Sequence, residues 1–247
     1  QNFKFVSSKN PVNRIHKDNL IEFDVIGQGS SFIAKIAFYI QEERLVIIKK
    51  PSGTDPKHQE LIRRQIRFGT NVTHQLLPKF YGIVQGDNFP VFEYINGETL
   101  SLIDKSELSK EEIIHIIFDI MLFTEIIHEN KLIIRDLNPT NIIIDKNKRA
   151  ILIDFDRILN FEEANREDRT RDFVSGFISS ALNSRDLIKI DPSCDIDSIY
   201  NIIEYINETI ITFSKTDEIL ELILIFFIKF QIYLEEYLNK YYSNKST

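Results

Sequence analysis

The stretch IIRDLNPTNIII, from Ile133 to Ile144, places an Arg-Asp pair, a proline and a lone asparagine inside a run of isoleucines. Isoleucine-rich runs favour buried strands, whereas polar residues with a proline between them favour a loop. Binding and catalytic side chains are often carried by loops that a rigid scaffold holds in place. The stretch therefore predicts a functional loop between two buried segments, with Asp136 and Asn141 as candidate residues.

A further polar residue follows this loop. Asp154 lies 13 residues after Asn141, near the end of the apolar run AILIDFD. Two hairpin strands joined by the turn DKNKR would bring Asn141 and Asp154 side by side. Amide and carboxylate oxygens suit a hard divalent cation. The spacing predicts a magnesium site at these two residues, with Asp136 left to act on a hydroxyl group.

The N-terminal part carries a candidate phosphate site. Residues 20–50 contain short runs of β-branched and aromatic residues, which predict antiparallel strands joined by tight turns. Gly27 and Gly29 lie between two such runs, where backbone N–H groups could approach phosphate oxygens. Lys49 ends the apolar run about twenty residues later, and a half-buried ammonium group needs an anionic partner. An ordinary turn and a solvent-exposed lysine are the alternatives.

Helical periodicity dominates the rest of the chain. Residues 56–70 carry apolar side chains at helical spacing after a proline, which predicts one helix packed on the sheet. Ser109 and Glu112 match a capping box, and the apolar stripe after them predicts a long, largely buried helix. The spacing is again helical after residue 195, and residues 217–242 predict a core-packing helix, with a membrane-binding or partner-binding face as the alternative. A β-rich lobe followed by a helical lobe is an α+β arrangement.

The composition excludes several function classes. A net charge of -7 and scattered basic residues give no sign of a continuous surface for nucleic acid. The only cysteine, Cys194, excludes an internal disulfide framework and a multi-thiolate metal site, and it suits a reducing compartment. No signal-peptide pattern is present, and no apolar run reaches the roughly 18 residues of a membrane span. We expect a cytoplasmic protein, or a secreted effector acting in a reducing cytosol.

These motifs resemble those of the protein-kinase superfamily, and they occur in the family's order over residues 20 to about 210. The resemblance implies a bilobal, protein-kinase-like α+β fold. Its β-rich N-lobe would span residues 20–95, its mainly helical, truncated C-lobe residues 96–247, and an N-terminal extension residues 1–19. The resemblance also implies ATP and Mg²⁺ as cofactors and a protein as substrate.

The resemblance implies that the N-lobe and the hinge hold ATP. The hinge would be VFEYINGETL, with Phe92 as gatekeeper. A helix carboxylate should pair with Lys49; Glu60 is the nearest acid and our expected partner, although alignment on LLPKFYG places Gln65 there. The implied nucleotide-binding residues are Gly27, Gly29, Ala34, Lys49, Glu60, Glu93, Ile95 and Glu98.

The resemblance likewise implies the catalytic roles. Asp136 would accept the proton of the attacking hydroxyl, and Asn141 and Asp154 would hold magnesium. Asp195 would brace the catalytic loop. The implied catalytic residues are Asp136, Asn138 and Lys49.

Two features of the implied activation segment bear on regulation and substrate. Thr170 lies where many kinases carry an activating phosphate, which Arg135 could bind, and an ordinary loop threonine is the alternative. The segment DFVSGFISSAL resembles the seat of a peptide substrate.

Several positions depart from the family pattern. Ile134 replaces a histidine, and Asn138 replaces a lysine whose charge faces the transferring phosphoryl group. Asp156 replaces a glycine, so that IDFDR is closer to bacterial sugar and lipopolysaccharide kinases, and no Ala-Pro-Glu motif ends the peptide seat. The leading hypothesis is a Ser/Thr protein kinase. The alternatives are a small-molecule, sugar-type kinase and a pseudokinase that acts as a binding or scaffold module.

Overall fold

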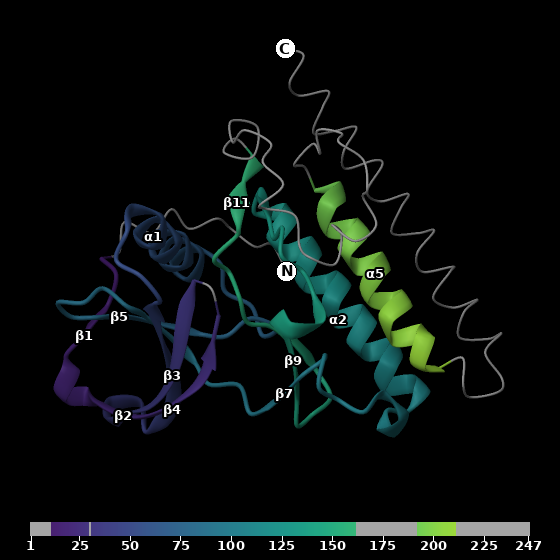
Figure 1. Cartoon of the computed structure of the whole chain (residues 1–247), viewed down its shortest axis with the longest axis horizontal. Coiled ribbons are helices and arrows are strands. Elements are labelled where there is room, and N and C mark those ends of the chain that lie inside the picture. Colours follow the sequence, from purple (N-terminus) through teal and green to yellow (C-terminus); the bar gives the residue numbers. More distant parts are fainter. Residues whose placement is uncertain (1–10, 30, 162–191, 211–247) are drawn as a thin grey trace, which may run out of the picture.

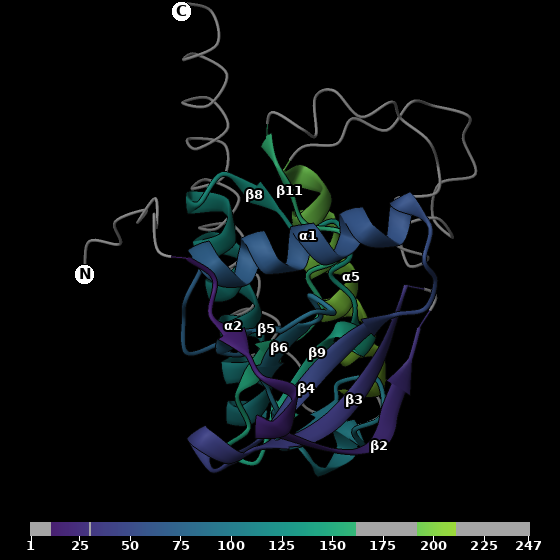
Figure 2. The ribbon, with the colours of Figure 1, turned by 90° about the vertical axis from the view of Figure 1, so that its left-hand side faces the viewer.

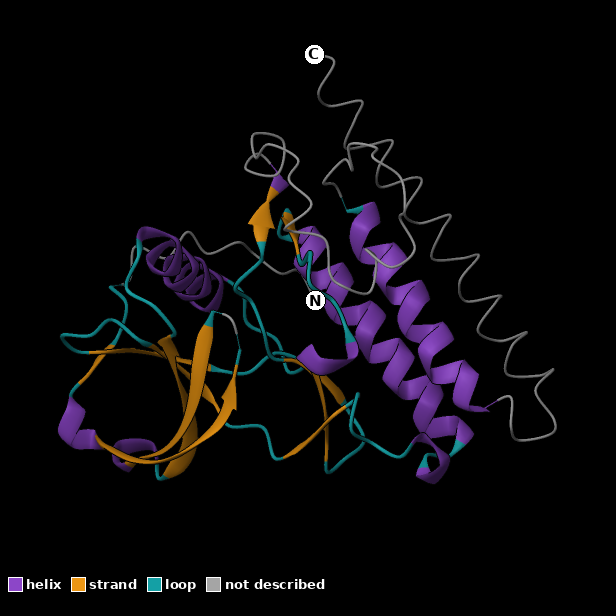
Figure 3. Ribbon diagram, viewed as in Figure 1, coloured by secondary structure: helices purple, strands orange, loops and turns teal. Residues whose placement is uncertain are grey.

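The computed structural model describes residues 11–29, 31–161 and 192–210. Figures 1 and 3 show an N-terminal part made mainly of strands beside a part in which two long helices, α2 (Lys110–Glu129) and α5 (Ser193–Ile210), run side by side. Apolar surfaces of both parts pack into one core between them. The expected bilobal, kinase-like α+β fold is confirmed.

A six-stranded sheet forms the N-lobe. Neighbouring strands are antiparallel, except that the first strand of the chain pairs in parallel with its neighbour. The strands expected within residues 20–50 are three of the six. In spatial order the strands are β1 (Arg14–Ile15), β5 (Phe80–Val84), β6 (Pro90–Glu93), β4 (Arg44–Pro51), β3 (Phe32–Tyr39) and β2 (Leu20–Gln28).

Strand β1 belongs to the segment expected to be an N-terminal extension, yet it joins the sheet. Asn13 anchors it, because its side chain donates to the Tyr81 carbonyl at 2.9 Å and its own carbonyl accepts from Ile83 N–H at 2.9 Å. Gly82 permits this approach, since its φ is +136° and a Cβ there would lie 2.3 Å from the Asn13 carbonyl oxygen. Residues 13–15 are therefore part of the lobe.

Helix α1 (Pro56–Asn71) confirms the helix expected at residues 56–70 and packs against β4, β5 and β6 (Figure 2). Asp55 caps its first turn by accepting from His58 N–H at 3.0 Å, and Pro56 fits the first turn because its missing N–H needs no partner there. The face that it buries consists of Leu61, Ile62, Gln65 and Phe68.

Helix α2 begins at the expected capping box. Ser109 Oγ accepts from Glu112 N–H at 3.2 Å, and the Glu112 carboxylate accepts from Ser109 N–H at 2.7 Å. The DKNKR hairpin is also confirmed: it joins β9 (Ile142–Asp145) to β10 (Ala150–Leu152), and β9 pairs on its other side with β7 (Gly97–Thr99). The candidate loop leads directly into β9, the central strand of this small sheet.

The remaining regular elements are short. A two-stranded sheet pairs β8 (Leu132–Ile133) with β11 (Leu159–Asn160). The single-turn 3-10 helices are η1 (Lys17–Asn19), η2 (Ile40–Glu42), η3 (Lys105–Glu107) and η4 (Pro139–Asn141).

Phe155 joins the two lobes. Its ring stacks on Phe68 of α1 at 4.3 Å between centroids and lies 5.6 Å from the ring of Phe92 in β6. All three rings are buried. Because Phe155 directly follows Asp154, this aromatic contact fixes the backbone beside a candidate metal ligand.

Three sequence expectations fall outside the described residues: Thr170, the peptide seat at 172–182 and the helix at 217–242. Within the part that is described, no helix is both long and apolar enough to cross a membrane.

Candidate active site

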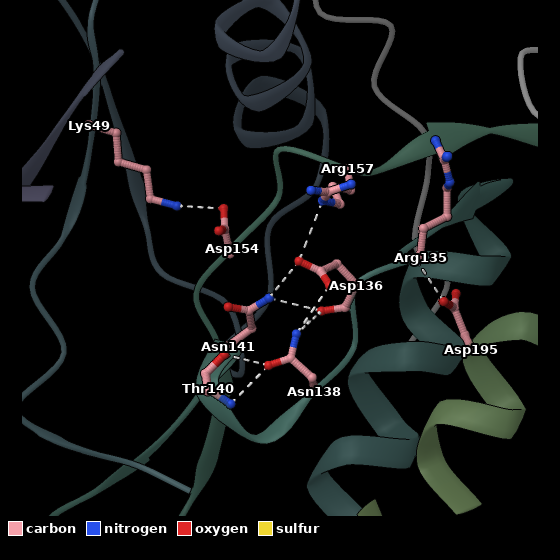
Figure 4. A network of polar contacts seen from close by, with 9 residues as sticks. All are labelled: Lys49, Arg135, Asp136, Asn138, Thr140, Asn141, Asp154, Arg157 and Asp195. Atoms are coloured by element: carbon pink, nitrogen blue, oxygen red, sulfur yellow. Dashed lines mark hydrogen bonds and ion pairs between the residues drawn. The ribbon is translucent and has the colours of Figure 1, made fainter. Parts of the chain in front are cut away.

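The loop between β8 and β9 is organised around Asp136 (Figure 4). Asn138 donates to Asp136 Oδ1 at 3.2 Å, and Asn141 donates to Asp136 Oδ2 at 3.1 Å. The same two amides also donate to the Asp136 backbone carbonyl, at 3.1 and 2.9 Å. Both carboxylate oxygens are thus oriented by neutral donors that come from the loop itself.

Asp195, in α5, binds the backbone at the start of this loop. Its buried carboxylate accepts from Ile134 N–H and Arg135 N–H, both at 2.8 Å, and lies 2.8 Å from His128 Nε2. These bonds stabilise a backbone turn in which Arg135 has a φ of +68°. The bracing role implied for Asp195 therefore agrees with the structure.

Lys49 meets Asp154 across the two lobes. Lys49 Nζ lies 3.0 Å from Asp154 Oδ1 and donates to the Ile153 carbonyl at 2.9 Å. The rings of Phe92 and Phe155 lie within 6 Å of the ammonium group, so much of its surroundings is apolar. In this arrangement Lys49 has the anionic partner that a largely buried ammonium requires.

The expected pairing of Glu60 with Lys49 is not the one found. Glu60 lies 3.5 Å from both Arg63 and Arg64 on the same helix, and its side chain is 47% exposed. The two residues lie on different faces of α1: Gln65 is on the buried face that points toward the sheet and core, and Glu60 is not. Gln65 is fully buried, and neither polar atom of its amide has a hydrogen-bond partner among the described residues.

The glycine loop, Ala34 and Lys49 are in register across three strands. Gly27 of β2 pairs with Ala34 of β3, and Ala34 pairs with Lys49 of β4. Glu93 ends β6, where its N–H donates to the Lys79 carbonyl at 2.8 Å. Ile95 follows as a half-buried residue of the connection, and Glu98 is exposed on β7.

Asn141 and Asp154 offer oxygen atoms of the type that magnesium binds. Asn141 uses its amide nitrogen to bind Asp136, so its oxygen can serve as a ligand, and the backbone bond from Ile153 N–H to the Asn141 carbonyl at 3.0 Å holds the two segments together. Among the described residues, no three His, Cys, Asp or Glu side chains form a metal cluster. Magnesium commonly binds through one or two protein oxygens plus water and phosphate, so this pair fits it.

Burial shapes the acidity of the site. It raises the pKa of Asp136, and Asp154 raises that pKa further, while the nearby Arg157 charge opposes the change. Burial and the neighbouring Asp154 raise the pKa of Asp156 to about 6, against the lowering effects of Lys49, Arg157 and the Ser31 hydroxyl. Three carboxylates and two cations therefore share a small volume.

Comparison with known proteins identifies the family. A sequence model of the protein kinase domain matches residues 20–185, which is more than half of the chain. The chain belongs to the protein kinase superfamily. This kinase domain shares 25% identity with a MAP kinase kinase of Saccharomyces cerevisiae over 56% of the chain and 30% of that relative.

Two further relatives are more similar in sequence. A dual specificity protein kinase of Dictyostelium discoideum is 35% identical over 57% of this chain and 19% of its own length. A serine/threonine-protein kinase of Synechocystis is 33% identical over 52% of the chain and 27% of its own length. The chain therefore spans less than a third of the curated relatives that it matches.

The sequence did not lead us to expect Arg157 among the residues of the candidate site. It follows the Asp-Phe-Asp run, and its Nε lies 3.7 Å from Asp136 Oδ2 (Figure 4). The available signal was the sequence IDFDR, in which an arginine comes two residues after Phe155. The direction of its side chain depends on a turn after β10 that no local pattern specifies.

Proposed function

We propose that this kinase domain is an ATP- and Mg²⁺-dependent phosphotransferase that transfers the γ-phosphate to a Ser or Thr hydroxyl of a protein. The observation that carries the proposal is the convergence of Lys49, Asp136, Asn141 and Asp154 from both lobes. Each of these side chains has the type that phosphoryl transfer needs: a cation, a base and two oxygen ligands. A binding module without activity would not require all four.

The proposed mechanism assigns one task to each residue. Lys49 and the backbone N–H groups of the glycine loop hold the phosphates, and Asn141 and Asp154 hold the metal. Magnesium, when bound, would neutralise charge on the β- and γ-phosphate oxygens. Asp136 orients the attacking hydroxyl and accepts its proton as the oxygen–phosphorus bond forms and the bond to the ADP oxygen breaks.

The comparison with relatives bears on the class of acceptor. The relatives include both a serine/threonine-protein kinase and a dual specificity protein kinase, which favours a protein hydroxyl. A small-molecule, sugar-type acceptor is the second candidate, and the observation that favours it is the buried Asp156 in place of a glycine.

The test is transfer of labelled phosphate from ATP with magnesium. We expect label on the chain itself or on a generic protein, and its loss in Asp136→Ala but not in the exposed control Asp87→Ala. Label on small hydroxylated acceptors alone would replace the protein by a small molecule. Absence of both transfer and nucleotide binding would favour the scaffold alternative and contradict the proposal.

A further inference from the structure

The catalytic loop of this kinase domain lacks a cation at a place where charge develops. Asn138 stands two residues after Asp136, and its amide is neutral. Its oxygen accepts from Thr140 N–H at 2.9 Å, and its nitrogen donates to Asp136. The side chain is thus held as a structural cap of η4 and supplies no charge to a phosphoryl group.

Arg157 places a positive charge on the other side of the same aspartate. Its Nε lies 3.7 Å from Asp136 Oδ2, the oxygen that also accepts from Asn141. The side chains of Arg157 and Asp136 are 29% and 24% exposed, so both remain partly accessible to a substrate. An arginine carries five N–H donors in a planar fork, so it can face a carboxylate and a phosphoryl oxygen together.

The surroundings of Arg157 orient it. Together with the buried carboxylate of Asp156, whose charge acts on it, Arg157 lines a cavity of about 100 Å³. Asp156 and Asp136 both attract the guanidinium, which keeps a cation near the catalytic aspartate. The cavity is lined by Ser31, Lys57, His58, Leu61, Arg64, Asp156 and Arg157.

We propose that Arg157 contacts the transferring phosphoryl group and supplies the positive charge that Asn138 does not. The inference rests on the proposed phosphotransferase function. Arg157 is then a catalytic residue in the strict sense, because it touches the group being transferred. A cation that stabilises charge developing in the transition state acts mainly on turnover and little on nucleotide binding.

The experiment compares Arg157→Gln, Asn138→Lys and the double variant with the wild-type chain. The exposed Arg63→Gln is a matched control for loss of an arginine. We expect Arg157→Gln to lower the rate of phosphate transfer at saturating MgATP by about 100-fold or more. Adding Asn138→Lys to it should restore at least about tenfold, because the lysine returns a cation to the other side of Asp136.

A second readout does not depend on turnover. Aluminium fluoride with MgADP mimics the phosphoryl group in flight, and transition-state mimics bind more tightly than ground-state ligands. Wild type should bind MgADP more tightly when the fluoride is present, and Arg157→Gln should lose that gain while its affinity for MgADP alone changes less than about twofold.

The outcomes separate the inference from the function on which it rests. If wild type transfers phosphate and Arg157→Gln matches it in rate and in fluoride-dependent binding, Arg157 has no such role and the phosphotransferase stands. Arg157→Lys, which keeps the positive charge, serves as the conservative variant. Suppose that Asn138→Lys does not rescue the activity, and that Arg157→Gln and Arg157→Lys lose MgADP affinity or folding to the same extent. Arg157 then has a structural role, and the inference is overturned. A wild-type chain that does not bind MgADP overturns both.

Discussion

At the scale of single residues, Gln65 and Asp156 are buried polar side chains whose burial costs stability for two different reasons. Gln65 lies on the inner face of α1 with no hydrogen-bond partner for either amide atom among the described residues. Asp156 is buried next to the like-charged carboxylate of Asp154. A buried amide without partners and a buried carboxylate beside a like charge both destabilise the folded state, so both positions make predictions about stability.

Replacing Gln65 with methionine should stabilise the protein. The side chains have similar volume, and the change removes an amide whose burial without partners costs about 1–3 kcal/mol. We expect the free energy of unfolding, measured by chemical denaturation, to rise by about 1 kcal/mol. Gln59→Met on the exposed face of the same helix should leave it unchanged. A decrease at position 65 would show that the amide is satisfied.

Replacing Asp156 with asparagine should stabilise the protein in a pH-dependent way. The folded-state pKa of about 6 lies above the ordinary 3.8, so the folded chain binds the proton more tightly than the unfolded chain. Wild-type stability therefore falls as the pH rises from about 4 to about 6 and stays lower above that range. The penalty approaches about 3 kcal/mol at pH 7, since each pKa unit corresponds to about 1.4 kcal/mol.

Denaturation of Asp156→Asn and wild type between pH 4 and pH 8, without divalent cations, measures this penalty. The two free energies of unfolding should be similar near pH 4, with the variant more stable at pH 7. A constant difference across the whole range would contradict the raised pKa.

At the scale of elements, Asp119 fastens the β9–β10 hairpin to α2. Its buried carboxylate accepts from Arg149 Nε and from a terminal Arg149 nitrogen, both at 2.7 Å, and from Ala150 N–H at 3.0 Å. Because the hairpin begins next to Asn141 and ends next to Asp154, this anchor bears on the spacing of the candidate metal ligands.

Asp119→Asn should lower the free energy of unfolding by about 2–4 kcal/mol. The change removes the buried negative charge that accepts three hydrogen bonds, and it places the new amide NH2 group against an N–H donor that needs an acceptor. Asp87→Asn, at an exposed pair with Lys17, should cost less than about 1 kcal/mol. Equal small losses in both variants would mean that the anchor contributes little.

Sequence reasoning reached the elements more readily than the contacts between them. The helix at 56–70, the capping box at Ser109 and the DKNKR hairpin follow from local patterns, and the structure confirms them. Strand β1 escaped notice because a two-residue strand carries no periodicity. The expected pairing of Glu60 with Lys49 was wrong because the rotation of α1 about its axis decides which side chain lies on its inner face. The presence of a single acidic residue in the helix does not reveal that rotation.

At the scale of the whole molecule, the candidate site takes one cation from the N-lobe and its acids from the C-lobe. Lys49 and Asp154 lie on different lobes and meet at 3.0 Å. A ligand that contacts both should therefore stabilise the two lobes together. Any ligand that binds only the folded chain raises its stability, by about 2.7 kcal/mol at a concentration of 100 Kd.

Nucleotide should raise the melting temperature strongly only when magnesium is present. Chelation with EDTA should remove most of the shift, and Asp154→Asn should remove the magnesium-dependent part because a carboxylate ligand is lost. The exposed Asp104→Asn should behave as wild type. A shift that is the same with EDTA, or that persists in full in Asp154→Asn, would contradict the metal assignment.

The ring of Phe155 stacks on Phe68 while the adjacent Asp154 faces Lys49. Dissolved salt screens the attraction between Asp154 and Lys49 but does not weaken a contact between aromatic rings. High ionic strength should therefore loosen the carboxylate before it loosens the backbone that carries it. In such a solution a movement of α1 would still displace residue 154, because the stacked rings of Phe68 and Phe155 would continue to connect them.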